Sequence, residues 1–432
     1  MKSYSSYKPT PLEWMGEIPS HWIFTKNKYG FQKSDNGSNE SEDTNVLSLT
    51  INGIKIKTDL SFGKSTESYI GHQLVKKGDI VFTPRDFDQT PILSDVSKYN
   101  GCISNLYIVD RTKENVLNHY VNYYWYGLKY SVNYFKNFSH GLRYSFNRFQ
   151  FEEIPLLTPP LSEQQHIINY LDIKTKQIDS LIEKTKQKIE LLKEQRTSCI
   201  HHMVTKGLDS QVKMKDSGVE WFSEIPNHWK LVKVGHYTNV VRGGSPRPAG
   251  DPRFFNGDFI HWITVKDITK PDGKYVYTTD SHLTKEGMEQ SRVLEEETLV
   301  LTNSGATLGV PKILKIRGCI NDGSVAFLNV SNNLYRDFLY YFFTTQTTLL
   351  LEQQSGYGQP NLNIEIVSNI KFPLPPFEEQ LRIVDYLDKE IPKIDSLVEK
   401  ENIRLDLLRE YRESLIFEVV TGKINVRDEV LV

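Results

Sequence analysis

Cysteine, long apolar runs and an excess of either charge are all scarce in this chain of 432 residues. Its three cysteines, Cys102, Cys199 and Cys319, are odd in number and lack metal-ligand spacing, so we expect reduced thiols without a disulfide framework or a zinc set. No apolar run approaches the roughly 18 residues that span a bilayer, and the N-terminus lacks the apolar segment of a secretory signal. We therefore expect a cytoplasmic protein that does not enter a membrane.

The net charge of −2 does not by itself indicate a nucleic-acid partner. Residues 20–157 carry 16 basic and 14 acidic side chains, residues 227–374 carry 15 and 14, and residues 375–432 carry 9 and 14. The two interior regions are therefore the least acidic parts of the chain. Charge permits nucleic-acid binding without predicting it, and we expect partner subunits to supply part of any phosphate neutralisation.

What the chain does have is an internal repeat. Pro160–Asp172 returns as Pro376–Asp388 at an ungapped offset of 216 residues, and Ile178–Leu181 returns as Ile394–Leu397 at the same offset. Each copy starts at a proline pair and continues with acidic residues, which suit the first turn of a helix. We predict two copies of one long helix. A chain with two similar units can present two similar surfaces to duplex DNA, which has approximate two-fold symmetry.

The predicted helices carry apolar residues at alternating steps of four and three, the pattern of a coiled-coil seam. The seam positions are Leu171, Thr175, Ile178, Ile182, Thr185, Ile189, Leu192, Arg196, Cys199 and Met203 in the first copy, and Leu387, Ile391, Ile394, Val398, Glu401, Leu405, Leu408, Arg412, Leu415 and Val419 in the second. If the helices pair antiparallel about a local dyad, Arg196 would face Glu401 and fix the register. Alternatively, both seam arginines lie flat on the helices and extend to solvent.

A second repeat opens each half of the chain. Glu13–Trp22 returns as Glu220–Trp229 at an offset of 207 residues, with the shared pattern E-W-x-x-E-I-P-x-H-W. We expect His21 and His228 in these segments to pack beside the neighbouring tryptophans. Each half therefore consists of this opening, a variable interior region and a long helix.

Fainter matches lie within the interior regions. The tripeptide Gly-Cys-Ile occupies residues 101–103 and 318–320, and an aromatic run at residues 123–126 has its counterpart at residues 340–343, both at an offset of 217. We expect these aromatic side chains to belong to the core rather than to stack on bases. The two interior regions are interpreted as divergent copies of one fold.

Two P-x-x-E-Q helix starts, helix ends in V-T and two E-W-x-x-x-I-P-x-H-W openings together resemble the specificity subunits of type I restriction-modification enzymes, over essentially the whole chain. The resemblance implies an α+β fold with a pseudo-two-fold repeat, in which two globular target-recognition domains are separated by two long helices forming an antiparallel coiled coil. The expected segments are a first target-recognition domain at 1–157, a first repeated helix at 158–206, a linker and start of the second half at 207–226, a second target-recognition domain at 227–374, a second repeated helix at 375–423 and a C-terminal tail at 424–432.

The resemblance also implies a non-catalytic subunit that binds double-stranded DNA. Each target-recognition domain would read one half of a bipartite target, while the helices set the spacing and dock two modification (methyltransferase) subunits, to which restriction (helicase-nuclease) subunits are added. No cofactor is expected on this chain; S-adenosylmethionine, ATP and Mg²⁺ would belong to the partner subunits. The helix residues expected to serve spacing and docking are Glu163, Gln164, Leu171, Ile178, Ile182, Arg196, Glu379, Gln380, Leu387, Ile394, Val398 and Arg412.

Polar loops in the interior regions are the candidates for DNA contact. Glycine lets a backbone approach a groove closely, and the side chains of Arg, Asn, Gln and Tyr match the donors and acceptors of base edges. For each loop a plain surface turn is the alternative, and most contacts in such interfaces go to phosphate and sugar. The candidates are Arg85, Arg143, Tyr144 and Asn147 in the first region, and Arg242, Ser245, Arg247, Asn303, Ser304, Thr307, Tyr357, Gln359 and Asn361 in the second.

Catalytic motifs are incomplete. Phe62–Ser65 resembles the end of a phosphate-binding loop but lacks its first glycine, and the proline pairs within Thr158–Leu161 and Leu374–Phe377 lack the amide or carboxylate found in amino-methyltransferases. The sequence therefore favours a subunit that binds without performing chemistry. The rival hypothesis is a scaffold whose helices dimerise partner proteins and whose globular parts bind protein or carbohydrate.

Overall fold

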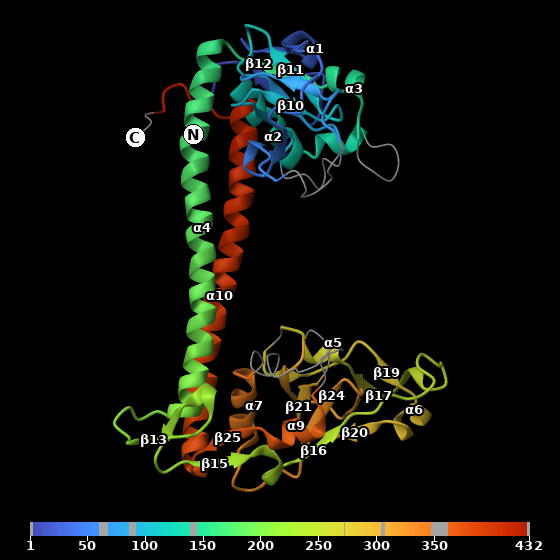
Figure 1. Cartoon of the computed structure of the whole chain (residues 1–432), viewed down its shortest axis with the longest axis vertical. Coiled ribbons are helices and arrows are strands. Elements are labelled where there is room, and N and C mark those ends of the chain that lie inside the picture. The colour runs from blue at the N-terminus through green and yellow to red at the C-terminus, as the bar shows by residue number, and fades with distance from the viewer. Residues whose placement is uncertain are drawn as a thin grey trace. The chain divides into compact units, whose positions relative to one another are not determined.

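The protein is described from a computed structural model, which covers residues 3–59, 68–85, 92–138, 145–271, 273–303, 307–346 and 362–429. It divides into two compact units, one made of Met1–Gln187 with Asn402–Val432 and the other of Lys188–Glu401. Each unit joins one globular part to a segment of each long helix (Figure 1). Both ends of the chain belong to the first unit.

The globular part of the first unit is built of short strands. Its largest sheet has the order β4-β11-β8-β9, and the strand pairs β10-β7, β5-β6, β12-β3 and β1-β2 complete it. The elements are β1 (Tyr7–Pro9), β2 (Glu17–Pro19), β3 (Ile23–Lys26), α1 (Asn27–Gly30), β4 (Phe31–Lys33), β5 (Leu47–Thr50), β6 (Gly53–Ile56), β7 (Gln73–Val75), β8 (Ile80–Phe82), β9 (Ser94–Val96), β10 (Gly101–Ile103), β11 (Ile108–Thr112), α2 (Asn118–Tyr130), the 3-10 helix η1 (Tyr134–Phe138), α3 (Arg148–Glu152) and β12 (Pro155–Thr158).

The second unit repeats this plan with longer sheets. Its sheets have the orders β16-β24-β21-β22-β18 and β19-β17-β23-β20, with the pairs β15-β25 and β13-β14. The elements are β13 (Met214–Asp216), η2 (Glu220–Phe222), β14 (Glu224–Pro226), β15 (Lys230–Lys233), η3 (Val234–His236), β16 (Asn239–Arg242), β17 (Phe255–Ile263), α5 (Val265–Ile268), β18 (Tyr275–Val276), β19 (His282–Leu283), α6 (Lys285–Glu289), β20 (Arg292–Leu294), β21 (Leu299–Thr302), β22 (Pro311–Leu314), β23 (Gly318–Ile320), β24 (Ser324–Leu328), α7 (Arg336–Thr344), α9 (Ile364–Asn369) and β25 (Lys371–Leu374).

The two sets of strands correspond one to one over most of the fold. The order β4-β11-β8-β9 matches β16-β24-β21-β22, the pair β10-β7 matches β23-β20, and the antiparallel pairs before and after each sheet also match. Shared topology of this kind confirms that the interior regions are divergent copies of one fold. The second copy differs mainly by the long strand β17, which pairs with β19 and, in parallel, with β23.

The repeated Gly-Cys-Ile tripeptide is a buried strand in both units. A side chain on Gly101 would bring its Cβ within 2.4 Å of the Asn45 carbonyl oxygen, and one on Gly318 within 3.0 Å of the His261 carbonyl oxygen. Glycine is needed because another strand segment passes directly beside it. Cys102 and Cys319 are fully buried free thiols, and burial raises the pKa of each.

Aromatic side chains fill the cores, as expected. In the first unit Tyr120, Tyr124 and Leu128 recur every four residues along α2 and are fully buried, which gives the helix one apolar face. Trp125 of the same helix meets Phe82 of β8 edge to face, with ring centroids 4.8 Å apart. In the second unit α7 supplies an equally aromatic buried face.

The long helices α4 (Leu161–Lys206) and α10 (Phe377–Val420) pair through the predicted seam. The apolar seam positions are buried or partly buried, and most of their side chains join the hydrophobic core of the unit to which they belong. Within the second unit, residue numbers rise along α4 while those of their ion-pair partners fall along α10, so the helices run antiparallel. Both the coiled-coil seam and its direction are confirmed.

The predicted partner of the seam arginine is wrong. Arg196 binds Asp395, with Nε and Oδ1 2.7 Å apart, whereas Glu401 receives the Lys188 ammonium at 2.6 Å. The equivalent Arg412 in the first unit binds Asp179 at 2.8 Å. Each arginine therefore leaves the seam sideways to reach the aspartate of the repeated Ile-Asp-Ser-Leu, which requires no buried ion pair.

Gln164 and Gln380 join each helix start to the domain it follows. Both side chains are fully buried. The Gln164 carbonyl accepts from the backbone N–H of Leu117 at 2.8 Å, and its amide donates to the carbonyls of Asn115 and Pro159. Gln380 makes the same three bonds in the second unit. The side chain thus satisfies the backbone in front of α2 or α7, which defines a domain-helix junction.

These bonds correct the alignment of the aromatic runs. Gln164 bonds Asn115 and Leu117 just before α2, while Gln380 bonds Asn333 and Tyr335 just before α7. The aromatic helices α2 and α7 therefore correspond at an offset of 218 residues rather than 217. One extra residue lies between the Gly-Cys-Ile strand and the helix in the second unit. A gap of one residue shifts which side chains of a helix face the core, and similarity of the aromatic letters alone could not detect it.

The opening segments also meet the helix starts. His21 Nε2 lies 2.8 Å from Glu163 Oε2, and His228 Nε2 lies 2.9 Å from Glu379 Oε2. The His228 ring meets the Trp229 ring edge to face with centroids 6.4 Å apart, as expected, whereas the His21 ring packs against Tyr4 at 5.7 Å. Both histidine side chains remain partly exposed, at 41% and 43%. It is Trp22 and its counterpart that are fully buried.

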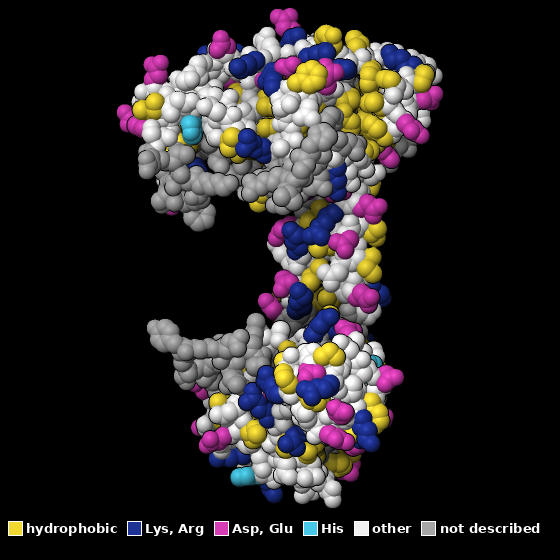
Figure 2. Space-filling view, turned by 90° about the vertical axis from the view of Figure 1, so that its right-hand side faces the viewer, with side chains coloured by type: hydrophobic (Ala, Val, Ile, Leu, Met, Phe, Trp, Pro, Cys, Tyr) yellow, Lys and Arg dark blue, Asp and Glu magenta, His cyan; other side chains and the backbone are white. Residues whose placement is uncertain are grey.

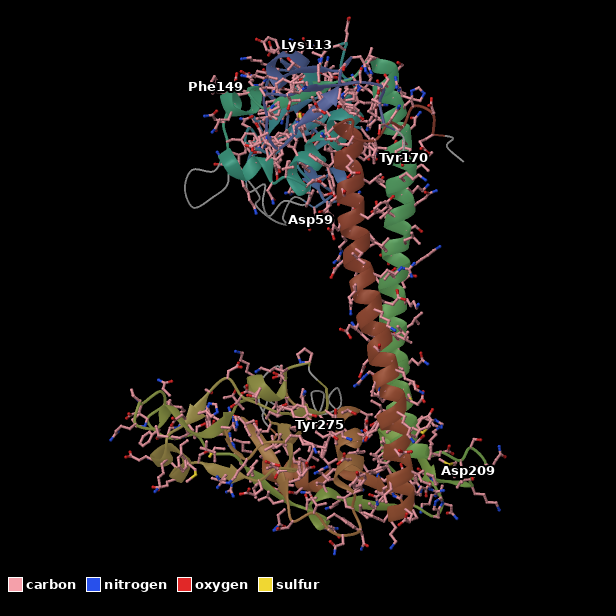
Figure 3. The ribbon with its side chains drawn as sticks, turned by 180° about the vertical axis from the view of Figure 1, so that it is seen from behind. Asp59, Lys113, Phe149, Tyr170, Asp209 and Tyr275 are labelled. Atoms are coloured by element: carbon pink, nitrogen blue, oxygen red, sulfur yellow. The ribbon has the colours of Figure 1, made fainter. Side chains whose placement is uncertain are left out.

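The C-terminal segment closes the first unit. Lys423 donates to the backbone carbonyls of Met15 and Glu17, and the side chains of Ile424 and Val426 enter the core. Tyr170 on α4 (Figure 3) is only 7% exposed, whereas its repeat counterpart on α10 is 38% exposed. Tyr170 belongs to the same hydrophobic core as Ile424 and Val426 of the tail, and burial raises the pKa of its phenol.

Candidate nucleic-acid interface

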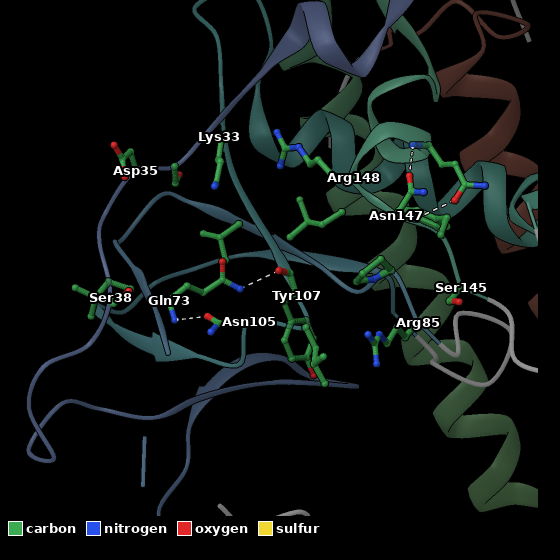
Figure 4. A pocket seen from close by; sticks show the side chains of 18 of the residues that line it. Lys33, Asp35, Ser38, Gln73, Arg85, Asn105, Tyr107, Ser145, Asn147 and Arg148 are labelled. Atoms are coloured by element: carbon green, nitrogen blue, oxygen red, sulfur yellow. Dashed lines mark hydrogen bonds between the residues drawn. The ribbon is translucent and has the colours of Figure 1, made fainter. Parts of the chain in front are cut away.

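A polar hollow lies beside the loop that follows the Gly-Cys-Ile strand in each unit. In the first unit the hollow has a volume of about 890 Å³ (Figure 4). The polar side chains lining it come from separate segments brought together by the sheets: Lys33, Ser34, Asp35, Ser38, Gln73, Arg85, Asn105, Tyr107, Ser145, Asn147, Arg148 and Gln150. Two of the predicted DNA contacts, Arg85 and Asn147, are among them.

Arg85 is held at the hollow by its backbone. Its strand forms an isolated antiparallel bridge to Ser145, and its carbonyl accepts from the Thr83 hydroxyl at 3.1 Å. The Arg85 side chain is exposed, and neither it nor Lys33 on β4 has an ion pair among the described residues. Their cationic groups are therefore available to an anionic ligand.

Asn147 has a structural duty as well. Its Oδ1 accepts from the backbone N–H of Gln150 at 2.9 Å, and the Gln150 side chain accepts from the Asn147 N–H at the same distance, which forms the capping box of α3. The side-chain NH₂ of Asn147 has no hydrogen-bond partner among the described residues and can donate to a ligand. Sequence reasoning identified the residue but missed its role as a helix cap.

Two buried aspartates beside this hollow hold further arginines in place. The Asp110 carboxylate accepts from both Nη1 and Nη2 of Arg148, with Nη2 and Oδ2 2.9 Å apart. The Asp79 carboxylate accepts from Nη2 of Arg111 at 2.7 Å. Burial raises the pKa of Asp110, while the Arg148 charge opposes that shift. Arg148 lines the hollow with its guanidinium held by Asp110, whereas Lys33 and Arg85 form no ion pair with any described residue.

In the second unit the hollow has a volume of about 560 Å³, and Asp322 organises it. The Asp322 carboxylate accepts from the Ser245 hydroxyl at 2.7 Å and from Arg247 at 3.2 Å, and its backbone carbonyl accepts from Arg242 at 2.8 Å. Three predicted DNA contacts thus converge on one residue that the sequence analysis did not single out. The other lining side chains include Phe255, Asn256, Trp262, Thr264, Ser281, His282 and Asn321.

The two hollows occupy equivalent positions in the repeat. Asn105 and Asp322 each lie two residues beyond the end of the Gly-Cys-Ile strand, and Ser38 and Ser245 stand at the 207-residue offset of the opening repeat. All four line a hollow. Position within the repeat was thus the available signal for Asn105 and Asp322.

Two further candidates in the second unit lie apart from the hollow. Asn303 is fully buried, and its backbone pairs with Gly323 and Leu362. The Asn303 amide has no hydrogen-bond partner among the described residues. Thr307 is exposed, and its carbonyl accepts from the Thr302 hydroxyl. The remaining predicted contacts lie outside the described residues: Arg143, Tyr144, Ser304, Tyr357, Gln359 and Asn361.

The described residues contain no grouping of three or more His, Cys, Asp or Glu side chains that could hold a metal ion. No helix within the described ranges has a stretch long and apolar enough to cross a bilayer.

Comparison with known proteins identifies similar chains along the whole length. The description "Type I restriction modification DNA specificity domain" matches residues 23–191 and 226–406. A putative type I restriction enzyme MjaX specificity subunit of Methanocaldococcus jannaschii is 22% identical over 440 residues, which cover 98% of this chain and 97% of that one.

Solved structures agree in fold. A chain from a structure concerning complex assembly and conformational transition of the type I R-M system aligns with a TM-score of 0.75 over 94% of this chain and 99% of that chain, at 15% identity. The HsdS subunit from Thermoanaerobacter tengcongensis aligns with a TM-score of 0.56 over 96% of this chain and 100% of that one, also at 15% identity.

Proposed function

Since this chain belongs to the type I restriction modification DNA specificity family, we propose that each of its two units reads one half of a bipartite target in double-stranded DNA. The observation that carries the proposal is the pair of polar hollows at equivalent positions of the repeat, lined by different side chains. Equivalent position suits two similar approaches to DNA, and different linings suit two different half-sites.

The first hollow offers donors suited to DNA. The free charges of Lys33 and Arg85 neutralise phosphates or donate to guanine, while the NH₂ group of Asn147 donates to a base acceptor. In the second hollow, Ser245 and Arg247 present similar groups beside Asp322, and Arg242 binds the Asp322 backbone carbonyl from outside the lining. Thr307 and the candidates outside the described residues remain proposed DNA contacts.

The long helices would set the spacing and dock two modification subunits. The predicted apolar seam residues Leu171, Ile178, Ile182, Leu387, Ile394 and Val398 pack inside and suit the spacer role. Docking falls instead to exposed apolar side chains at equivalent positions: Leu181 and Leu407 in the first unit, Leu397 and Leu191 in the second. Figure 2 shows such hydrophobic side chains among charged ones along the helices. Paired sites on a repeated helix would bind two copies of one partner.

Chemistry would then come from the partners. S-adenosylmethionine would reside on the modification subunits, and ATP with Mg²⁺ on the restriction subunits. This chain contributes binding, position and spacing in the cytoplasm of its host.

Footprinting tests the proposal. A tag on the full chain recovers the complex from its host, and methylome sequencing of that host supplies the target duplex. We expect two protected patches separated by an unread gap, and loss of both when the target is scrambled. Protection that does not depend on sequence, or recovery of the chain with proteins unrelated to DNA, would instead support the scaffold hypothesis.

A further inference from the structure

The second hollow holds an arginine and an aspartate side by side at the surface. Arg247 Nη2 lies 3.2 Å from Asp322 Oδ2, and the side chains are 70% and 42% exposed. Both line the hollow. A guanidinium has five N–H donors, and most of those of Arg247 are not engaged by described residues. The Asp322 carboxylate also retains unused lone pairs, so this Arg247–Asp322 couple can bind a further group that both donates and accepts.

The couple is held in a defined position. Ser245 donates to Asp322 Oδ1 at 2.7 Å, and Arg242 donates to the Asp322 backbone carbonyl at 2.8 Å. The backbone N–H of Arg247 bonds the Gln290 side chain at 3.2 Å, which fixes the other partner. A reader of base edges needs this kind of support, because its donors and acceptors must be in place before DNA arrives.

A carboxylate at a DNA surface restricts what it can meet. Phosphates repel it, so its favourable partners are the amino groups of cytosine and adenine. An adjacent guanidinium prefers the O6 and N7 acceptors of guanine. A single G·C pair presents N7, O6 and the cytosine N4 amino group in a row across the major groove, which complements two donors followed by an acceptor.

On the basis of the proposed DNA-reading function, we propose that Arg247 and Asp322 together read one G·C pair of the second half-site, Arg247 binding guanine and Asp322 binding the cytosine amino group. Among the described residues of the first unit, the arginine–aspartate pairs Arg111–Asp79 and Arg148–Asp110 have fully buried aspartates, and Asn105 stands at the position equivalent to Asp322. Asn105 is engaged internally by the Gln73 N–H at 2.8 Å and the Gly71 carbonyl at 3.0 Å. The proposal therefore applies to one half-site only.

Base analogues test the two contacts separately. The probe is the duplex identified by the host methylome, and the protein is the full chain recovered with its native partner subunits. At one G·C pair, 7-deazaguanine removes the N7 acceptor and 2-pyrimidinone removes the cytosine amino group. We expect each analogue at the same pair to weaken wild-type binding roughly five- to 150-fold, the range for one specific base contact.

Variants assign each contact to its residue. Arg247→Ala should lose sensitivity to 7-deazaguanine, and Asp322→Ala should lose sensitivity to 2-pyrimidinone. Arg247→Lys should retain charge but lose most of the preference for guanine, because it lacks the planar fork. Arg253→Ala is the matched control, since Arg253 forms an exposed pair with Asp251 at 2.7 Å in the same unit but does not line the hollow.

Several outcomes would overturn the inference. In one, Arg247→Ala weakens DNA binding equally on all sequences, which would indicate a phosphate contact. In another, no G·C pair of the target exists at which both analogues weaken binding by the wild-type protein. The wild-type measurement stands even if a variant fails to fold. Binding without any sequence preference would instead reject the underlying DNA-reading function.

Discussion

At the residue scale, the repeated glutamines join each long helix to the domain in front of it. Gln164 and Gln380 are fully buried, and each satisfies one N–H and two carbonyls of its own chain. Identity at an offset of 216 predicted that these positions matter. Their distant partners could not be predicted, because the Asn115 and Asn333 carbonyls lie in loops 49 and 47 residues away, whose backbone path no local pattern encodes.

Replacing Gln164 by alanine should therefore destabilise the first unit. The change leaves the Leu117 N–H and the Asn115 and Pro159 carbonyls buried without partners, and we expect a loss of about 2 to 4 kcal/mol in the free energy of unfolding. Urea unfolding followed by fluorescence measures it. Gln165→Ala, at the adjacent exposed position, is the control and should change stability by less than about 0.5 kcal/mol.

Buried tyrosines predict a loss of stability in alkali. Burial raises the pKa of Tyr126 to about 12 and that of Tyr340 to about 12. The folded state keeps these phenols protonated while the unfolded state ionises near pH 10, so stability is full below pH 10 and falls as pH rises towards 12. Between pH 10 and 12, we expect each tyrosine to lower the free energy of unfolding by about 1.4 kcal/mol per pH unit.

Urea unfolding at pH 8 and at pH 11 checks the sign. Tyr126→Phe and Tyr340→Phe should each flatten the decline, whereas Tyr277→Phe, at a residue that is 64% exposed, should leave it as in the wild type. Equal slopes in all four proteins would contradict the assignment.

At the element scale, the helix pair shows what periodicity can and cannot predict. Heptad spacing predicted the buried seam correctly, because burial depends only on which face each residue occupies. The partner of Arg196 depended instead on axial register and side-chain reach, and Asp395 was nearer than Glu401. The repeated Ile-Asp-Ser-Leu already contained the correct aspartate, but its position beside the seam concealed its role.

Double-mutant cycles distinguish the two pairings. Arg196 with Asp395 should show a coupling of about 0.5 to 1 kcal/mol that weakens at high salt, because the pair is partly exposed. Arg196 with Glu401 should show a coupling near zero. A larger coupling energy for Arg196 with Glu401 than for Arg196 with Asp395, measured by urea unfolding, would instead support the Arg196–Glu401 pair expected from the seam.

Exposed leucines on the helices should govern assembly. Leu181→Glu with Leu407→Glu in the first unit should weaken association with the modification subunits at least tenfold while leaving thermal stability nearly unchanged, because both side chains are exposed. Co-purification and titration measure this. Leu208→Glu, an exposed leucine beyond the end of α4, is the matched control and should assemble normally.

At the scale of the whole molecule, the predicted fold class is confirmed: two α+β recognition domains and two long helices. The fold class could be predicted from the sequence because each motif occurs twice, and the offset between the copies gives the length of the repeated unit. The composition of each unit was not accessible from sequence, because helix segments from the middle and from the C-terminal part of the chain contribute to the same core. Only antiparallel pairing of α4 and α10 brings them there.

The hollows mark the limit of sequence reasoning about function. Polar, glycine-bearing loops led to Arg85, Asn147, Ser245 and Arg247, which the folded chain brings to two equivalent hollows. Asp322 was missed, because its only sequence signal was its position two residues beyond the repeated Gly-Cys-Ile, where the first unit has Asn105. Convergence of three side chains on it exists only after β16 and β24 pair.

Exchange of one domain tests most directly the claim that each unit reads its own half-site. Residues 20–157 are replaced by the corresponding region of another member of the family, and the methylome of a host carrying the hybrid is sequenced. We predict a new sequence in one half of the methylated motif, with the other half and the gap unchanged. A change in both halves, or a motif identical to that of the wild type, would contradict the claim.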